Sequence, residues 1–206
     1  EKLNLKNNIF GHCNPKSSTG RLDIFCRTIV DYSDEYEKIP LNYKGEIFLE
    51  ITSRSFNIEF KKGDRLTQLR LIYNKHRYLS DHELKKINAK DKIVFNHNSN
   101  INKVIDNGLR VSVDLIRDNS IIAYCAKKNT PVLKFNKINM HKISDYWFSM
   151  SANKKHIVIK KNKFYILKSK EKIRIPNFLA GEMIPYDTGI GDFRAHYAGF
   201  FDPGFG

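Results

Sequence analysis

Short stretches in which apolar and polar residues alternate run along much of this chain and predict β-strands. They are rich in Ile, Val, Phe and Tyr, and they cover residues 22–30, 46–53, 56–60, 66–72, 109–115, 121–126, 156–160 and 163–168. One helix is indicated, because Ser80-Asp81-His82-Glu83 forms a capping box immediately before Leu84. The pattern therefore predicts a mainly β chain of the barrel or sandwich class.

A weak internal repeat changes this picture from one domain to two. The segment at residues 8–15 is echoed at residues 178–185, and each is followed by a polar, Gly-containing loop and a β-like run. Two copies about 170 residues apart predict tandem domains of one fold. Because the second copy stops where another strand is expected, we expect a piece of a longer protein. It would hold the C-terminal half of one β domain (1–72), a connector with one helix (73–108) and the N-terminal part of a second β domain (109–206).

The charge and the cysteines narrow the class of partner. The 206 residues carry a formal net charge of +14, but the lysines are spread along the chain rather than gathered in one stripe. This favours a compositional bias over a nucleic-acid partner, and the apolar runs are too short to span a membrane. Three cysteines (Cys13, Cys26 and Cys125) without a Cys-x-x-Cys pair indicate a reducing compartment, for which we expect the cytoplasm.

The segment from Lys16 to Arg21 concentrates groups that suit phosphate. It reads Lys-Ser-Ser-Thr-Gly-Arg and so offers a cation, three hydroxyls, a Gly for close backbone approach and a guanidinium. An ordinary polar turn is the alternative, since such residues are common in loops. The segment is not a Walker loop, because Gly-x-x-x-x-Gly-Lys-Ser/Thr is absent.

Glu50 is the candidate for acid–base chemistry. It ends the apolar run Ile47-Phe48-Leu49, and alternation places it on the same strand face as Phe48. It is either a solvent-facing strand residue or a partly buried carboxylate suited to moving protons. The scattered histidines show no metal-ligand spacing, so no metal site on the protein is expected.

These motifs together resemble the dCTP deaminase/dUTPase superfamily, and the chain looks like a fragment of the long, tandem-domain dCTP deaminases of bacteria. The resemblance rests on 16–21, on the Tyr-Lys-Gly-Glu-Ile-Phe-Leu-Glu run at 43–50, on 63–69 and on the tail at 183–206. It implies a dUTPase-like distorted β-barrel (β-clip) in two tandem, incomplete copies, with sites between barrel units in a trimer or pseudo-trimer. It also implies a nucleotide-binding hydrolase of dUTP biosynthesis, which converts dCTP to dUTP and ammonia without zinc.

The resemblance also implies roles for individual residues. The triphosphate, with its Mg²⁺, would be held by Lys16, Ser17, Ser18 and Arg21. Glu50 would be the general base, with Ser17 and Arg21 placing the attacking water. Ala198 and Asp202 would contact the nucleoside. The zinc deaminases carry His-x-Glu and Pro-Cys-x-x-Cys motifs, and neither occurs here.

Two departures from the family pattern suggest a composite site. The second copy reads Tyr-Asp-Thr-Gly-Ile-Gly at 186–191, where the first has Lys16 to Arg21, and the first copy has Pro40 where the second has Asp202. We therefore expect the first copy to hold the phosphates and the second to hold the nucleoside. On this model the general base could also come from the second copy, beyond Gly206, with Glu50 as its counterpart. A dUTP pyrophosphatase and an inactive nucleotide-binding remnant of a split gene are the alternatives, and a nucleic-acid binder is a weaker third.

Overall fold

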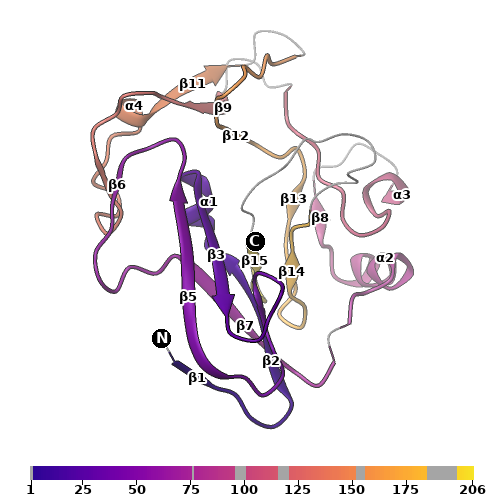
Figure 1. The fold of residues 1–206 in the computed structure, drawn as a ribbon. Helices are drawn as coiled ribbons and strands as arrows, with labels where there is room; N and C mark the ends of the chain where they lie inside the picture. Colours follow the sequence, from indigo (N-terminus) through magenta and orange to yellow (C-terminus); the bar gives the residue numbers. More distant parts are fainter. Residues whose placement is uncertain (1, 76, 96–100, 116–120, 152–155, 185–198) are drawn as a thin grey trace. The chain divides into compact units, whose positions relative to one another are not determined.

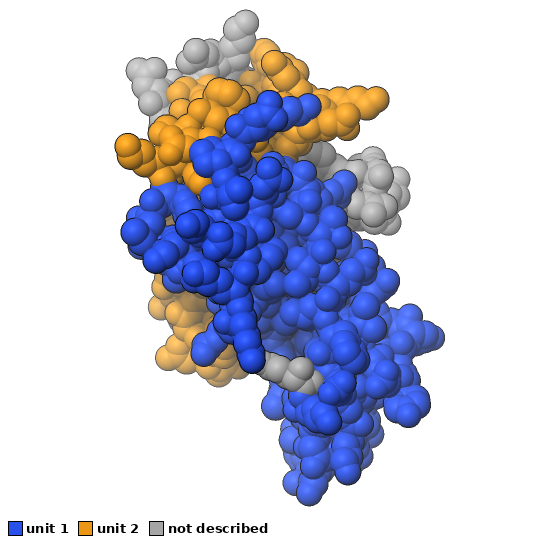
Figure 2. Space-filling model, turned by 60° about the vertical axis from the view of Figure 1, so that its left-hand side comes forward, with its two compact units in different colours: residues 1–76, 128–141, 182–200 blue, residues 77–127, 142–181, 201–206 orange. Residues whose placement is uncertain are grey.

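A computed structural model describes residues 2–75, 77–95, 101–115, 121–151, 156–184 and 199–206. The chain divides into two compact units, which Figure 2 colours separately. Unit 1 consists of residues 1–76, 128–141 and 182–200, and unit 2 consists of residues 77–127, 142–181 and 201–206. The described elements are mainly strands (Figure 1), which confirms the mainly β class predicted from the sequence.

Unit 1 is built around two three-stranded antiparallel sheets (Figure 1). One has the order β1 (Lys2–Asn4), β5 (Lys44–Ser53), β3 (Ile24–Val30), and the other β4 (Lys38–Ile39), β2 (Ile9–Pro15), β7 (Thr67–Tyr73). The short strands β6 (Ile58–Glu59) and β10 (Leu133–Lys134) pair in parallel. Every second side chain of β3 is buried, as the two-residue period of a strand requires, and its Val30 joins a core with Leu5, Cys13, Ile39 and Tyr43.

Unit 2 contains a three-stranded antiparallel sheet and three helices of the described residues, whereas helix α1 (Ser17–Arg21) belongs to unit 1. The sheet has the order β11 (Trp147–Ser151), β9 (Ile121–Ala126), β12 (Tyr165–Leu167), and β13 (Lys172–Ile173) pairs with β8 (Val94–Phe95). The helices of this unit are α2 (Asp81–Lys90), α3 (Ile101–Val104) and α4 (Ile143–Tyr146). Ile93, Val94 and Val104 form the buried core beside α2. Two further short strands, β14 (Gly181–Glu182) and β15 (Phe200–Phe201), pair with each other.

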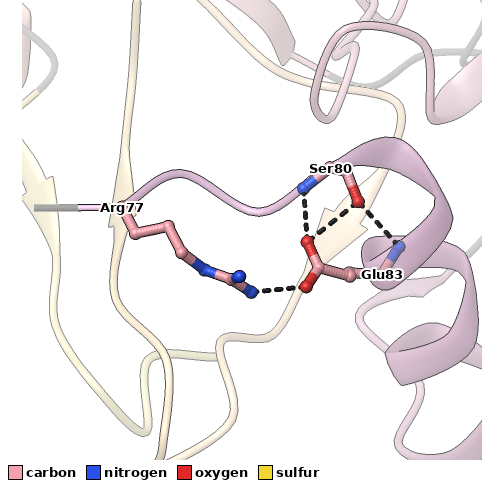
Figure 3. A network of polar contacts seen from close by, with 3 residues as sticks. All are labelled: Arg77, Ser80 and Glu83. Carbon is pink, nitrogen blue, oxygen red and sulfur yellow. Dashed lines mark hydrogen bonds and ion pairs between the residues drawn. The ribbon is translucent and has the colours of Figure 1, made fainter.

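Helix α2 begins at the capping box that the sequence predicts (Figure 3). The backbone N–H of Glu83 donates to Ser80 Oγ at 3.3 Å, and the backbone N–H of Ser80 donates to the Glu83 carboxylate at 2.9 Å. Arg77 forms an ion pair with the same carboxylate. The hydrogen bonds from Ser80, followed by that from Arg77, lower the pKa of Glu83 to about 2.

The strand predictions are confirmed in part. The structure has strands that overlap 22–30, 46–53, 56–60, 66–72 and 163–168, with β5 beginning two residues earlier and β7 ending one residue later than predicted, and β9 has the predicted bounds 121–126. The predictions at 109–115 and 156–160 are wrong. The first makes two isolated bridges instead of a ladder, and the second is an apolar run without assigned strand structure, in which Val158 is exposed. Strand β2 was not predicted.

Candidate active site

The segment from Lys16 to Arg21 folds as a short helix, α1 (Ser17–Arg21), rather than as a turn. Two hydrogen bonds fix it to the start of β7. The buried hydroxyl of Thr19 donates to the Leu66 carbonyl oxygen at 2.7 Å, and the backbone N–H of Lys16 donates to the same oxygen at 2.9 Å. Because Thr19 and Gly20 are the buried residues of this helix, the segment is held by its small side chains.

The charged and hydroxyl groups of this segment stay accessible. Ser17 and Arg21 are exposed, and Lys16 and Ser18 are half-buried. The Nε–H group of Arg21 donates to the Ser17 carbonyl oxygen at 3.2 Å, which holds the guanidinium against the first turn of the helix. The structure thus brings together the four residues expected to hold a triphosphate, on one anchored element.

Glu50 lies near the middle of β5, where its Cα partner on β3 is Arg27. The side chain of Glu50 is exposed, so the partly buried carboxylate is not what the structure shows. Among the described residues, Glu50 forms no hydrogen bond or ion pair with helix α1. On the same strand face, Ile29 and Phe48 are 40% and 50% exposed, so Glu50 sits among apolar side chains that are open to solvent.

Arg27, opposite Glu50, was not singled out from the sequence. Its guanidinium lies 4.4 Å from the ring centroids of both Phe25 and Tyr36, which hold it by cation–π contact. Phe25 is two residues away on the same strand, so alternation could have indicated that contact. Tyr36 comes from a loop, and local sequence carries no signal for it.

The loop expected to contact the nucleoside spans residues 198–202, and we call it the nucleoside loop. Its residue Gly199 is buried and lies against Pro15, the residue before Lys16. A methyl group on Gly199 would come within 2.6 Å of the Pro15 carbonyl oxygen. Within unit 1, a segment of the second copy therefore reaches the base of helix α1.

Of the two residues predicted to contact the nucleoside, the structure describes Asp202 alone. Ala198 lies outside the described residues, as does the 186–191 segment of the second copy. Asp202 belongs to unit 2 and is exposed. It starts a turn in which the Phe205 N–H donates to its carbonyl oxygen at 3.1 Å, and Gly204 has the positive φ of +83° that such a turn favours.

Family models account for nearly the whole chain. Residues 1–75 match the model of the 2′-deoxycytidine 5′-triphosphate deaminase N-terminal domain, and residues 80–206 match that of the C-terminal domain. Comparison with curated proteins returned no match.

Among solved structures, the chain is similar to the crystal structure of 2′-deoxycytidine 5′-triphosphate deaminase from Agrobacterium tumefaciens. The two share 38% sequence identity with a TM-score of 0.90. The match covers 100% of this chain and 61% of that one, so this chain spans less than two thirds of the relative's length. The likeness confirms a β fold of the dUTPase-like kind.

Proposed function

We propose, from the premise that this chain belongs to the 2′-deoxycytidine 5′-triphosphate deaminase family, that it takes part in the hydrolytic deamination of dCTP. The reaction consumes one water and yields dUTP and ammonia, and it would supply dUTP for pyrimidine deoxynucleotide synthesis. The similar Agrobacterium tumefaciens protein carries this deaminase name.

The site would divide the work between phosphate binding and proton transfer. Lys16, Ser17, Ser18 and Arg21 would hold the triphosphate with its Mg²⁺. Glu50 would take a proton from a water that attacks C4 of cytosine and would return protons to the leaving amino group. Ser17 and Arg21 would orient that water and stabilise the charge that develops on the ring. No zinc is proposed, since the zinc-deaminase motifs are absent from the sequence.

The contact of Gly199 with Pro15 is the observation that carries this proposal. It sets Gly199 of the second copy against Pro15, the residue before the phosphate-binding segment of the first. A nucleotide held by its triphosphate at α1 would therefore lie close to Gly199. Ala198 and Asp202, on either side of it in the sequence, are proposed as nucleoside-binding residues from the family resemblance. Gly is required at such a position, because any larger residue would displace the Pro15 carbonyl.

Self-association fits the exposed surroundings of Glu50. A general base is most effective where water is partly excluded, yet Glu50, Ile29 and Phe48 are all open to solvent in the single chain. A second barrel unit that covers this apolar face would complete the site, as expected for a trimer or pseudo-trimer. The face is sufficient reason to expect one, because exposed apolar patches often mark interfaces.

Location is proposed on separate grounds. All three cysteines are buried and unpaired, which fits the reducing cytoplasm. None of the helices in the described ranges is long and apolar enough to cross a membrane.

The test is product analysis on the purified chain with dCTP and Mg²⁺. We expect equal amounts of ammonia and dUTP, with at least a hundredfold slower turnover for Glu50→Gln, within the range for removal of a general base. Glu46→Gln is the matched control, because Glu46 lies four residues away on the same face of β5 and its carboxylate pairs with Lys2 at the surface. It should retain wild-type turnover.

Other products would decide between the alternatives. Release of pyrophosphate and a monophosphate from dUTP would identify the pyrophosphatase instead. A folded chain that binds dCTP but releases no ammonia would contradict deamination by this chain and support the nucleotide-binding remnant.

A further inference from the structure

The β2–β7 sheet of unit 1 has one polar face whose side chains the proposed function does not use. His12 and Arg70 are Cα partners, and Asn14 and Gln68 form the next pair on the same face. His12 and Asn14 both contact Glu182 of β14. The Nδ1 atom of His12 lies 3.5 Å from Glu182 Oε1, and Asn14 Nδ2 donates to the same oxygen at 3.1 Å.

Phe200 of β15 is seated on the same polar face. Its side chain is buried, with the Arg70 guanidinium 3.8 Å from the ring centroid. The His12 ring meets the Phe200 ring in an edge-on arrangement, with the centroids 5.6 Å apart and the planes at 71°. Both kinds of contact are attractive, because the ring face is negative and its edge positive.

We propose that His12, Asn14 and Arg70 are positioning residues, and that they form a clamp on Glu182 and Phe200 that holds Gly199 against Pro15. Phe200 follows Gly199 directly in the chain. The clamp deepens the proposed function and rests on it: a segment already held at Phe200 needs no further ordering beside helix α1 when the nucleotide binds, so less affinity is lost on binding.

The burial of Glu182 makes this clamp more than a surface contact. Its side chain is only 12% exposed, and a carboxylate in that position must keep its hydrogen-bond partners. Replacing one member leaves the others with unsatisfied groups. The clamp therefore holds the segments in one arrangement rather than in several.

The repeat explains why the clamp joins unlike residues. Gly11-His12 and Gly181-Glu182 occupy the same place in the repeated segments 8–15 and 178–185. One position thus supplies an imidazole in the first copy and a carboxylate in the second. Two first copies would bring two imidazoles together, so the clamp favours the pairing of a first copy with a second.

Hydrogen–deuterium exchange tests the clamp directly, without a need for activity. We expect amides in the peptide 199–206 to exchange about tenfold faster in Glu182→Gln and Arg70→Met than in the wild-type chain. Glu59→Gln and Arg54→Met are matched controls in the same unit, and they should exchange at the wild-type rate. Arg70→Lys keeps a cation, so its exchange rate in this peptide should lie between those of Arg70→Met and the wild type.

Nucleotide kinetics supply the second readout. For both clamp variants we expect KM for dCTP to rise about tenfold, with kcat within about twofold of wild type. The double variant with His12→Gln and Glu182→Gln should raise KM no more than the worse of the two single variants, because both substitutions remove the same contact between His12 and Glu182.

Two results would overturn the clamp. The first is unchanged exchange in 199–206 for both variants. The second is faster exchange throughout unit 1 with an unchanged KM, which would show a general loss of stability. If the wild-type chain releases no ammonia, the proposed function fails, and the exchange rates still decide whether the clamp exists.

Discussion

At the scale of single residues, Glu37 is the most constrained group in unit 1. It has a positive φ of 67°, which is unusual for a residue with a side chain. Its backbone N–H donates to the Thr28 carbonyl oxygen, and its own carbonyl oxygen accepts the Cys13 N–H. Its Oε1 accepts the Thr28 backbone N–H at 3.3 Å. Its Oε2 and the Thr28 hydroxyl are buried with no hydrogen-bond partner within the described ranges.

Glu37→Gln is therefore expected to change how stability depends on pH. Burial raises the pKa of Glu37, and the hydrogen bond from the Thr28 backbone N–H offsets part of this. A carboxyl with a raised folded-state pKa contributes fully below its unfolded pKa, and the contribution is lost as pH rises through the folded value. Wild type should thus lose stability relative to Glu37→Gln as pH rises above the ordinary pKa of a glutamic acid. Urea unfolding at a series of pH values from acid to neutral measures this difference.

The control for Glu37 is Glu35→Gln, two residues earlier on an exposed position that pairs with Lys38. It should follow the wild-type curve. If the free energies of unfolding of wild type and Glu37→Gln depend on pH in the same way, a raised pKa of Glu37 is contradicted.

Single residues also show what the sequence could and could not predict. The phosphate-binding role of Lys16 to Arg21 was predicted from residue types alone, because phosphate chemistry limits the choice, and it stays a prediction. The solvent exposure of Glu50 was not, since a strand's alternation does not say what covers each face. His12 was not singled out from among the scattered histidines. Its position in the segment 8–15 is equivalent to that of Glu182 in 178–185, and this equivalence was a signal that the two could pair.

At the scale of elements, helix α2 depends on its first turn (Figure 3). Ser80→Ala removes the side chain that accepts the Glu83 N–H and should lower the free energy of unfolding of unit 2 by about 1 kcal/mol. The lowered pKa of Glu83, about 2, also predicts how this loss of stability depends on pH. Its contribution is present above the unfolded pKa and disappears as pH falls through about 2, so the Ser80→Ala loss should shrink in acid.

Chemical unfolding followed by circular dichroism measures this loss. Ser149→Ala, at an exposed serine on β11 of the same unit, is the control and should leave stability within about 0.5 kcal/mol of wild type. Equal stability of the two variants at neutral pH would contradict a role for the cap.

Elements also differ in how well local pattern predicts them. The cap of α2 was predicted because a capping box is complete within four residues. Strand β9 was predicted to the residue because its apolar run is continuous, with four of its six side chains buried. The 109–115 run failed, because strands form only where a partner is present, and alternation within one segment does not supply one. Helix α1 was missed for a similar reason, since its anchor is the distant Leu66 carbonyl.

At the scale of the whole molecule, the sequence predicts a tandem repeat, but it does not predict which residues of the two segments lie in contact. The repeat at 8–15 and 178–185 predicted two copies of one fold, and family models match both parts of the chain. The division at 1–72, 73–108 and 109–206 stays a prediction. Contacts such as Gly199 with Pro15 depend on residues about 180 positions apart, and a single sequence gives no register for them.

A complementation experiment tests whether one chain holds both halves of the site. Arg21→Met removes a proposed phosphate-binding group of the first copy, and Gly199→Val puts a larger side chain where the second copy meets Pro15. Each variant alone should lose dCTP turnover by about tenfold or more, because one half of the proposed site is lost. Because Gly199 contacts Pro15 within one chain, a mixture of the two variants refolded together should stay as inactive as either alone. If the halves came from different subunits, mixed oligomers would contain some intact sites, and recovery of turnover on mixing would place the composite site between chains. The double variant, mixed with wild type, controls for simple dilution: it should reduce turnover only in proportion to its share if each chain is self-sufficient.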